Sequence, residues 1–362
     1  MSAKKPDTIQ KPVIPPRDTD FDGKQLDLFR SFLGNGNQGC DRLSNTFDLW
    51  DSVPRYAMSR QQMTKIRKEK GFLSLQKVAF QYRSRPLEAR IQAARIIDEK
   101  TGTETDYYPS ANEELVEDAL RKIAAEQRNA FFNKESYRSG VVFTLHMLRE
   151  ELKKRGHTRS YQEIVLSLKI LARSSIEIIT TDGKDGEGFT INGYFSGLSA
   201  VSKNKIAEDP EAKWIVQFHP LVTQAIDALT YRQFNYAQMM SHRTQLARWI
   251  HKQLSLKFTF ASLMTSFEMR YSTIKRDSAL LEGYRQERQA IVKLDEAWDE
   301  LKASGVLMSV SKSEIRGPRA KLEDVVYTIK ASINFVTEMK AANKRHSDAI
   351  TVGNSAHVAK RR

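Results

Sequence analysis

The chain has 362 residues, of which 40% are hydrophobic and 28% charged, so it holds enough apolar material for about two domains of ordinary size. No run of about 20 apolar residues occurs, which excludes a membrane-spanning helix, and the single Cys40 excludes an intrachain disulfide and a cysteine-rich zinc site. The residues after Met1 lack the apolar segment of a secretory signal, so we expect a cytoplasmic protein.

The positive charge of the chain, a formal +14, is concentrated in three stretches. Residues 134–173 carry a net charge of +5, residues 231–293 carry +7, and residues 340–362 carry +5. Such clustering favours a polyanionic partner, with nucleic acid as the leading class. The alternative is a generally basic protein whose lysine-rich faces are only solvated.

Residues 1–45 have the composition of a disordered tail, because prolines at four positions interrupt any regular element and a glycine-rich stretch follows at residues 34–39. The glycines match the spacing G-x-G-x-x-G, but the segment before them does not have the pattern of a strand that ends in a nucleotide-binding turn. We therefore expect no nucleotide site there.

The first domain is predicted over residues 46–205. Its first elements are expected to be a hairpin at residues 90–98 and 105–108, a helix at 110–128 and a helix at 141–152. Ser110 and Glu113 have the spacing of a capping box at the start of the first of these helices. Apolar residues at helical spacing, from position 141 onward, predict the second.

A third helix of this domain is predicted to begin at Ser160. Its inward residues would be Ile164, Val165, Leu168 and Leu171, and its outward residues would be Gln162, Lys169 and Arg173. Alternating apolar residues then predict two strands, around positions 176–178 and 189–191, with a flexible turn at 182–188 between them.

The second domain is predicted over residues 211–339 and repeats this order of elements without repeating the sequence. Its elements are expected to be helices at 236–256, 266–278 and 285–303 and a hairpin, with strands at 307–310 and 325–329 and a basic segment at 312–319 that turns around Gly317 and Pro318. Three helices followed by a hairpin with a basic turn describe a winged helix. The predicted fold class is therefore α+β, with two tandem winged-helix domains between a disordered tail at 1–45 and a disordered basic tail at 340–362.

Sequence motifs of common enzymes are absent. The seven histidines show no H-E-x-x-H and no paired metal spacing, and neither G-x-x-x-x-G-K-[ST] nor G-x-S-x-G occurs. Carboxylates such as Glu150 and Glu151 lie beside Lys153 and Lys154, where surface ion pairs explain them. We expect a binding protein rather than an enzyme, with no metal and no cofactor.

The helix predicted at residues 285–303 has the pattern of a recognition helix for the DNA major groove. One face is apolar, and near its N-terminal end the other carries Arg285, Arg288, Gln289 and Lys293. Arginine can pair with guanine and glutamine with adenine through two hydrogen bonds each. The alternative is a solvated amphipathic helix, since Glu287, Asp295 and Glu296 dilute the positive charge of the face.

Two further groups of residues are candidates for DNA contact. The predicted hairpin carries Lys312, Arg316, Arg319 and Lys321, which suit phosphate or minor-groove contacts. In the first domain the outward residues Gln162, Lys169 and Arg173 are a weaker candidate, and that surface could serve dimerisation instead.

Several segments of the sequence resemble the iteron-binding replication initiators of bacterial plasmids, of the RepA and TrfA type. The resemblance covers roughly residues 46–335 and is carried by FDLWDSVP at 47–54, YPSANEELVEDAL at 108–120, SGVVFTLHMLREEL at 139–152 and RSYQEIVLSLKIL at 159–171. It is specific in the first domain and looser in the second.

The resemblance implies two winged-helix domains that bind direct repeats in a plasmid origin, help to open an adjacent A+T-rich segment and recruit the host initiator, helicase and sliding clamp. It also implies an inactive or autorepressing homodimer formed through the first domain, a monomer on DNA, and a bacterial location with the nucleoid or plasmid. The main major-groove contacts would come from the second domain, where the helix at 285–303 corresponds.

A short peptide in the N-terminal tail resembles the sliding-clamp-binding peptide of bacterial replication proteins. Its residues are Gln25, Leu26, Asp27, Leu28 and Phe29. An extended peptide can place two apolar side chains in a pocket of its partner at a modest ordering cost. The alternative is an apolar patch that folds back on the first domain.

Two other functional classes stay open at this point. A winged-helix transcriptional repressor without a replication role would use the same DNA-binding residues but not the tail peptide. An enzyme that nicks or recombines the origin would require strand cleavage by the purified protein, which we do not expect.

Overall fold

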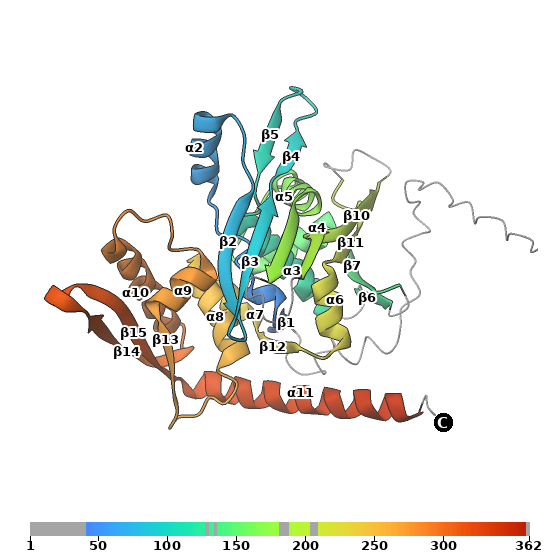
Figure 1. Ribbon diagram of the computed structural model, residues 1–362. Coiled ribbons are helices and arrows are strands. Elements are labelled where there is room, and N and C mark those ends of the chain that lie inside the picture. The colour runs from blue at the N-terminus through green and yellow to red at the C-terminus, as the bar shows by residue number, and fades with distance from the viewer. Residues whose placement is uncertain (1–40, 127–129, 134–135, 181–187, 203–208, 360–362) are drawn as a thin grey trace, which may run out of the picture.

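The computed structural model describes residues 41–126, 130–133, 136–180, 188–202 and 209–359, and they form a mixed α+β protein (Figure 1). Buried hydrophobic side chains form two large clusters, one made of residues from Phe47 to Met240 and the other of residues from Leu246 to Ala342. We call the elements from β1 to α7 the first unit and those from α8 to α11 the second unit.

The first unit contains most of the strands. Its elements are β1 (Leu43–Phe47), α2 (Arg60–Lys70), β2 (Gln76–Tyr82), β3 (Arg85–Gln92), β4 (Ala94–Ile97), β5 (Glu104–Tyr107), α3 (Ala111–Ala125), β6 (Ala130–Asn133), β7 (Arg138–Thr144), α4 (Leu145–Lys154), α5 (Tyr161–Arg173), β8 (Ser175–Thr180), β9 (Phe189–Gly193), β10 (Phe195–Val201), β11 (Lys213–Phe218), α6 (Pro220–Asp227), β12 (Tyr231–Asn235) and α7 (Tyr236–Ser241). The strands pair antiparallel in the orders β2-β3-β8-β9, β10-β11-β7-β6, β4-β5 and β1-β12.

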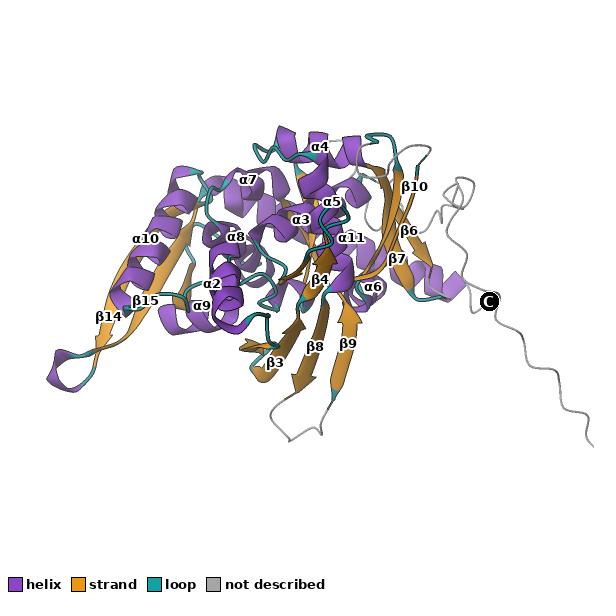
Figure 2. Ribbon diagram, turned by 90° about the horizontal axis from the view of Figure 1, so that it is seen from above, coloured by secondary structure: helices purple, strands orange, loops and turns teal. Residues whose placement is uncertain are grey.

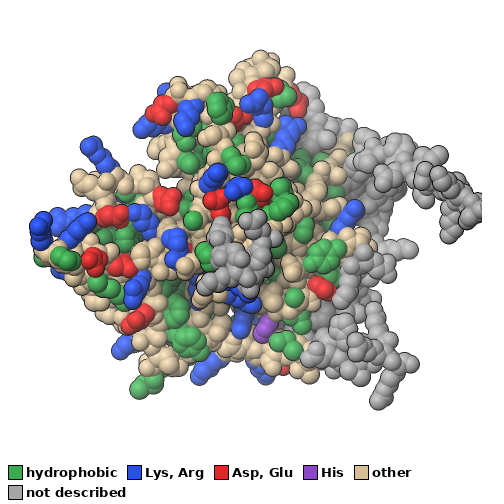
Figure 3. Space-filling model, in the orientation of Figure 1, with side chains coloured by type: hydrophobic (Ala, Val, Ile, Leu, Met, Phe, Trp, Pro, Cys, Tyr) green, Lys and Arg blue, Asp and Glu red, His purple; other side chains and the backbone are tan. Residues whose placement is uncertain are grey.

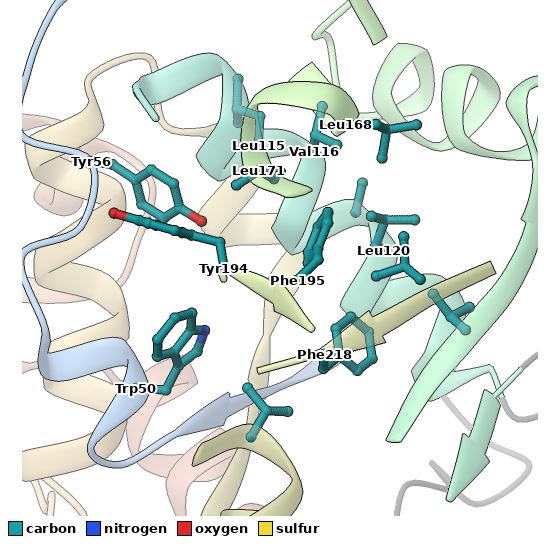
Figure 4. Packing of buried hydrophobic residues seen from close by; sticks show 14 of the residues in the cluster. Trp50, Tyr56, Leu115, Val116, Leu120, Leu168, Leu171, Tyr194, Phe195 and Phe218 are labelled. Carbon is teal, nitrogen blue, oxygen red and sulfur yellow. The ribbon is translucent and has the colours of Figure 1, made fainter. Parts of the chain in front are cut away.

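Helix α3 lies in the centre of the first unit and is buried along nearly its whole length. Its start follows from the sequence, because Glu113 accepts hydrogen bonds from the backbone N–H and the hydroxyl of Ser110, as the capping box predicts. Figure 4 shows Tyr194 between Tyr56 and Trp50, with ring centroids 5.8 and 5.9 Å from the two. This aromatic group closes one side of the core.

Buried charges attach the segment after β1 to α3. Trp50 Nε1 and Arg55 Nη1 each donate a hydrogen bond of 2.7 Å to Glu117, and Arg121 Nη1 donates one of 2.7 Å to Asp51. Burial alone would raise the pKa of Glu117, but Arg121 and Arg55 hold that pKa below its usual value. Each buried charge therefore has an opposite charge as its partner.

The second unit is smaller. Its elements are α8 (Gln245–Lys257), β13 (Ser266–Arg270), α9 (Tyr271–Ser278), α10 (Glu287–Ala303), β14 (Leu307–Arg316), β15 (Leu322–Ala331) and α11 (Ile333–Ala359). The three strands form an antiparallel sheet in the order β13-β15-β14. Ile291, Leu294, Trp298 and Leu301 of α10 are buried, as their helical spacing predicts.

Both units contain the same order of elements: a helix, a strand, two helices and a two-stranded hairpin. In the first unit these are α3, β7, α4, α5 and β8–β9, with the additional strand β6 between α3 and β7, and in the second unit α8, β13, α9, α10 and β14–β15. The sheets differ, because β13 pairs with the hairpin of its own unit whereas β7 pairs with β6 and β11. The repeat is thus one of element order, with different strand pairing.

Three predicted helices are interrupted in the structure. Residues 138–144 form strand β7, and α4 begins only at Leu145, after Thr144 caps it by accepting from the N–H of Met147. Residues 266–270 form β13, because they pair with β15. The helix predicted at 236–256 is divided into α7 and α8, since Thr244 caps α8 and its hydroxyl donates to Glu300. Each break depends on partners distant in the sequence.

The boundary between the units also differs from the prediction. Residues from 213 to 240, expected in the second domain, belong to the first cluster, because Trp214, Val216 and Phe218 of β11 alternate into it between β10 and β7. Residues 43–45, expected in the disordered tail, pair with β12 as part of β1. Residues 1–40 lie outside the described residues.

The C-terminal segment forms helix α11, where a disordered basic tail was predicted from residue 340. Phe335, Val336, Met339 and Ala342 are buried in the second cluster. Asn343 accepts a hydrogen bond from Arg232 of β12, so α11 also contacts the first unit. Figure 1 shows α11 as a long helix that passes below both units. Residues 360–362 lie outside the described part of the chain.

Candidate nucleic-acid interface

The N-terminal half of α10 exposes the four polar residues that the sequence predicts for DNA recognition. Arg288, Gln289 and Lys293 lie on the exposed face of the helix, and Arg285 lies in the loop just before it. Among the described residues, the side chains of Arg285, Arg288 and Gln289 have no hydrogen-bond or ion-pair partner. These three side chains can therefore bind an incoming ligand without first losing a contact.

The acidic residues of α10, which were expected to dilute its positive face, are largely engaged in contacts within the protein. Glu287 accepts hydrogen bonds from Lys275 at 2.5 Å and from Tyr271, both on α9, and these bonds hold the pKa of Glu287 below its usual value. Glu296 lies 2.7 Å from Lys293, so this pair is neutral as a unit. Glu287 therefore does not offset the charges of Arg285 and Arg288 at the start of α10, whereas Lys293 is itself neutralised by Glu296.

Asp295 of α10 forms hydrogen bonds with both strands of the hairpin β14–β15. Its two carboxylate oxygens accept hydrogen bonds of 2.7 Å from Tyr327 Oη on β15 and from Lys312 Nζ on β14. Burial and then the hydrogen bond to Asp295 raise the pKa of the Tyr327 hydroxyl well above its usual range. Lys312, predicted to contact phosphate, is thus engaged in positioning the hairpin in this structure.

The tip of the hairpin carries the other three predicted basic residues. Arg316 pairs with Glu314 and donates to the carbonyl of Ala320 at 2.8 Å, whereas Arg319 and Lys321 are exposed and have no ion-pair partner among the described residues. Arg319 has a φ of 59°, in the left-handed region, which turns the chain sharply at the tip. Figure 3 shows Lys and Arg side chains gathered at this end of the molecule, at the left edge of the view.

The candidate residues on α5 of the first unit are differently placed. Gln162 is exposed, but Lys169 Nζ donates to Glu99 at 3.3 Å and Arg173 donates to the carbonyl of Arg95 at 3.3 Å. Both partners belong to the hairpin β4–β5 or its turn, which packs on Ile170 of α5. DNA would have to replace these two contacts before it could bind Lys169 and Arg173.

A groove lies between the two units, beside the loop that leads into α10. Its cavity volume is about 640 Å³, and it is lined by residues of the first unit and by Gly283 and Tyr284 just before α10. A neighbouring cavity of about 250 Å³ shares Arg60 and Asn112 with it and reaches Glu163 at the start of α5. Two neighbouring cavities that share two lining residues therefore lie between the start of α5 and the loop before α10.

Sequence reasoning missed the residues that line this groove and the smaller cavity, because they come from distant parts of the chain. Arg60 and Asn112 line both cavities, Arg159 lines only the smaller one, and Tyr284 of the second unit lines the groove. The sequence does contain a signal for the helix that begins at Arg60: Ser59 and Gln62 have the S-x-x-Q spacing of a capping box, and a basic run follows them.

Two segments that the sequence singles out lie outside the described residues. The tail peptide Gln25, Leu26, Asp27, Leu28 and Phe29 and the turn at 182–188 are not in the described part of the chain, apart from Gly188. Within that part, no three His, Cys, Asp or Glu side chains form a group that could hold a metal ion. None of the helices described has the length and apolar character needed to cross a membrane.

No family model and no curated protein matches the chain. The fold is similar to two crystal structures of domains 2 and 3 of RctB. The first has 10% sequence identity and a TM-score of 0.46, and the match covers 80% of this chain and 99% of that chain. The second has 11% sequence identity and a TM-score of 0.45, and the match covers 73% of this chain and 93% of that chain. The crystal structure of the Pi initiator protein in complex with iteron DNA has 11% identity and a TM-score of 0.41 over 61% of this chain and 94% of that chain. These values describe a distant likeness, so the residues described above carry the functional argument.

Proposed function

We propose that this protein is a plasmid replication initiator that binds direct repeats in the origin DNA. The observation that carries the proposal is that α10 lies next to a basic hairpin. Helix α10 exposes Arg288 and Gln289, and the tip of the hairpin exposes Arg319 and Lys321. None of these four side chains has an ion-pair partner among the described residues. A helix with side chains that can pair with bases, next to a basic hairpin, is an arrangement that can read the major groove and bind phosphate at the same time.

We interpret each unit as a winged-helix domain. The order of helix, strand, two helices and hairpin supports this interpretation. In the second unit so do the sheet order β13-β15-β14 and the hydrogen bonds of Asp295, which hold the hairpin beside α10. In such a domain the helix before the hairpin enters the major groove and the hairpin contacts the backbone or minor groove. This assigns recognition to α10 in the second unit and to α5 in the first.

The contacts with DNA would be divided between α10, which reads bases, and the hairpin, which binds phosphate. Arg288 can form two hydrogen bonds with guanine and Gln289 two with adenine, each pairing contributing about 1–3 kcal/mol of discrimination. Arg319 and Lys321 would bind phosphate oxygens, which positions the domain without specifying sequence. In this proposal α5 and α10 enter two adjacent major grooves of one duplex, with the two neighbouring cavities between them.

A replication role, rather than repression alone, is supported by the tail peptide at residues 25–29 and by the sequence resemblance to plasmid initiators. In this proposal the peptide binds the host sliding clamp, and the DNA-bound monomer helps to open an A+T-rich segment and recruits the host initiator and helicase. A homodimer formed through the first unit would be the inactive form and would repress the protein's own gene.

A titration on the DNA that flanks the coding gene tests the proposal. Tandem repeats of about 20 bp should be found there, since each must span two grooves. At about 150 mM salt the purified protein should bind such a repeat about 10³-fold or more tightly than scrambled DNA. Equal affinity for both would refute it.

The tail peptide separates initiation from repression in a second experiment. Replacing Leu28 and Phe29 by alanine should abolish clamp binding and impair plasmid maintenance while leaving repeat binding intact. If plasmid maintenance and clamp binding were both unchanged, the protein would be a repressor without a replication role.

A further inference from the structure

Helix α2 (Arg60–Lys70) is a basic surface helix that lies outside the three basic stretches of the sequence. It contains five Lys or Arg residues and one Glu, a net charge of +4 over 11 residues. Met63 is fully buried and anchors its inner side, so the opposite face, with Gln61, Thr64, Lys65 and Lys68, is exposed to solvent. Its outer face is therefore a stripe of cationic and neutral donor side chains.

The charge of this stripe is hardly compensated within the protein. Lys65 Nζ lies 3.9 Å from Glu69, and both side chains are more than half exposed, at 78% and 57%. Lys68 and Lys70 have no ion-pair partner among the described residues. A long surface pair of this kind is screened by salt and leaves most of the positive potential available to a ligand.

Arginine contacts hold the helix rigidly on the first unit. Arg60 Nη2 lies 2.7 Å from the fully buried Glu113, and Arg67 Nη1 donates to the carbonyl of Asp106 at 2.5 Å. Both guanidinium groups lie over the ring of Tyr107, 4.7 and 5.1 Å from its centroid. The two arginines serve to position α2, and its lysines are presented on a fixed element.

The N-terminal end of α2 borders the groove between the units, opposite the loop that leads into α10. Gln62 approaches this loop so closely that a Cβ at Gly283 would lie 2.7 Å from Gln62 Nε2. Gln61 and Gln62 line the groove on one side and Tyr284 on the other. Figure 1 shows α2 between α10 and the hairpin β4–β5 that covers α5, and Figure 2 agrees from above.

We propose that the outer face of α2 binds the sugar-phosphate backbone of the duplex that α10 recognises. This inference rests on the proposed function and adds a third contact element between the two recognition helices. Lysine acts as a point charge toward phosphate, and the amide group of Gln61 can donate to a phosphate oxygen. The hydroxyl of Thr64 already donates to the carbonyl of Arg60. Such a contact increases affinity for any DNA sequence equally.

The test is the variant Lys65→Gln/Lys68→Gln of the full chain, measured by fluorescence anisotropy with the plasmid's direct repeat and with scrambled DNA between 50 and 300 mM salt. Each phosphate contact adds about 0.9 to the slope of log K against log salt, so the slope should fall by about 1.8. Affinity should fall by the same factor on both DNAs. The matched control is Lys340→Gln/Lys344→Gln, two exposed lysines of α11 on the opposite side of the molecule in Figure 1, and its slope should equal that of the unsubstituted protein.

The outcomes separate this inference from the proposed function. An unchanged slope in Lys65→Gln/Lys68→Gln, with normal binding by the unsubstituted protein, overturns the role of α2 and leaves the proposed function standing. An equal fall in the α11 control also overturns it, since the effect would then be one of net charge. If the unsubstituted protein does not bind DNA at all, both the proposed function and this inference fail.

Discussion

Lys252 of α8 donates a hydrogen bond of 2.6 Å to Asp118 of α3, across the contact between the two units. The same ammonium group donates to Glu114 at 3.1 Å, and all three side chains are at most 7% exposed. Gln253 of α8 adds a hydrogen bond of 2.9 Å to the carbonyl of Asp51. The contact between the units is thus built on buried polar groups that satisfy one another.

Replacing Lys252 by methionine should destabilise the protein strongly. The side chain keeps its length but leaves Asp118 and Glu114 buried without their cation, and breaking a buried ion pair in this way costs about 3–5 kcal/mol. Urea unfolding followed by tryptophan fluorescence measures the loss. Lys302→Met is the control, because Lys302 pairs with Asp299 at the surface and should contribute less than about 1 kcal/mol. Equal unfolding midpoints for the two variants would contradict this account.

The stability of the contact should also depend on pH through Asp118. Burial, together with the neighbouring charge of Glu114, outweighs the effect of Lys252 and raises the pKa of Asp118 from its usual 3.8 to about 6. A carboxyl whose pKa is raised by folding contributes stability that is complete below about pH 4 and is lost as the pH rises through about 6. Relative to Asp118→Asn, the unsubstituted protein should therefore lose stability between pH 4 and pH 7. A relative gain over that range would reverse the sign and refute the assignment.

Substitutions on α10 and on the hairpin should have different effects on DNA binding. Arg288→Ala or Gln289→Ala should reduce binding to the direct repeat by about 1–3 kcal/mol, or about 5- to 150-fold. The preference for one base position should relax at the same time. Arg319→Gln or Lys321→Gln should weaken binding to all DNA and lower the salt slope by about 0.9 each. Titrations on repeat and scrambled DNA at several salt concentrations distinguish the two patterns, and identical behaviour of all four variants would contradict the division.

Removing the carboxylate of Glu296 should strengthen DNA binding. Glu296 lies 2.7 Å from Lys293 and neutralises it, so Glu296→Gln releases one positive charge on the exposed face of α10. Affinity should rise, and the salt slope should steepen by up to about 0.9 if Lys293 reaches a phosphate. Glu150→Gln, which releases Lys153 on α4, is the control and should leave both quantities unchanged. Weaker binding by Glu296→Gln would show that the carboxylate itself has a role at the interface.

The sequence predicted those features that depend on neighbours within one or two turns. The capping box of Ser110 and Glu113 and the buried stripe around Ile291 are of this kind, and so the helices α3 and α10 were located correctly. Local periodicity predicts helix at residues 141–144 of β7 and 266–270 of β13, which form strands because they pair with β11 and β15, both remote in the chain. Local periodicity contains no information about such partners.

The candidate interface was predictable in its side chains but not in its arrangement. The exposure of Arg288 and Gln289 follows from the helical pattern of α10. The engagement of Lys312 with Asp295, and of Lys169 with Glu99, depends on how separate elements pack, as does the groove beside α2. These contacts decide which basic residues are available to DNA, and only the folded chain contains them.

The central claim is that both units bind one duplex, and a hydroxyl-radical footprint of the full chain on a single direct repeat tests it most directly. We predict two protected windows on one face of the DNA, centred about 10 bp apart, because adjacent major grooves are separated by one helical turn. Arg288→Ala should weaken only one of them. A single protected window, unaffected by that substitution, would contradict the account.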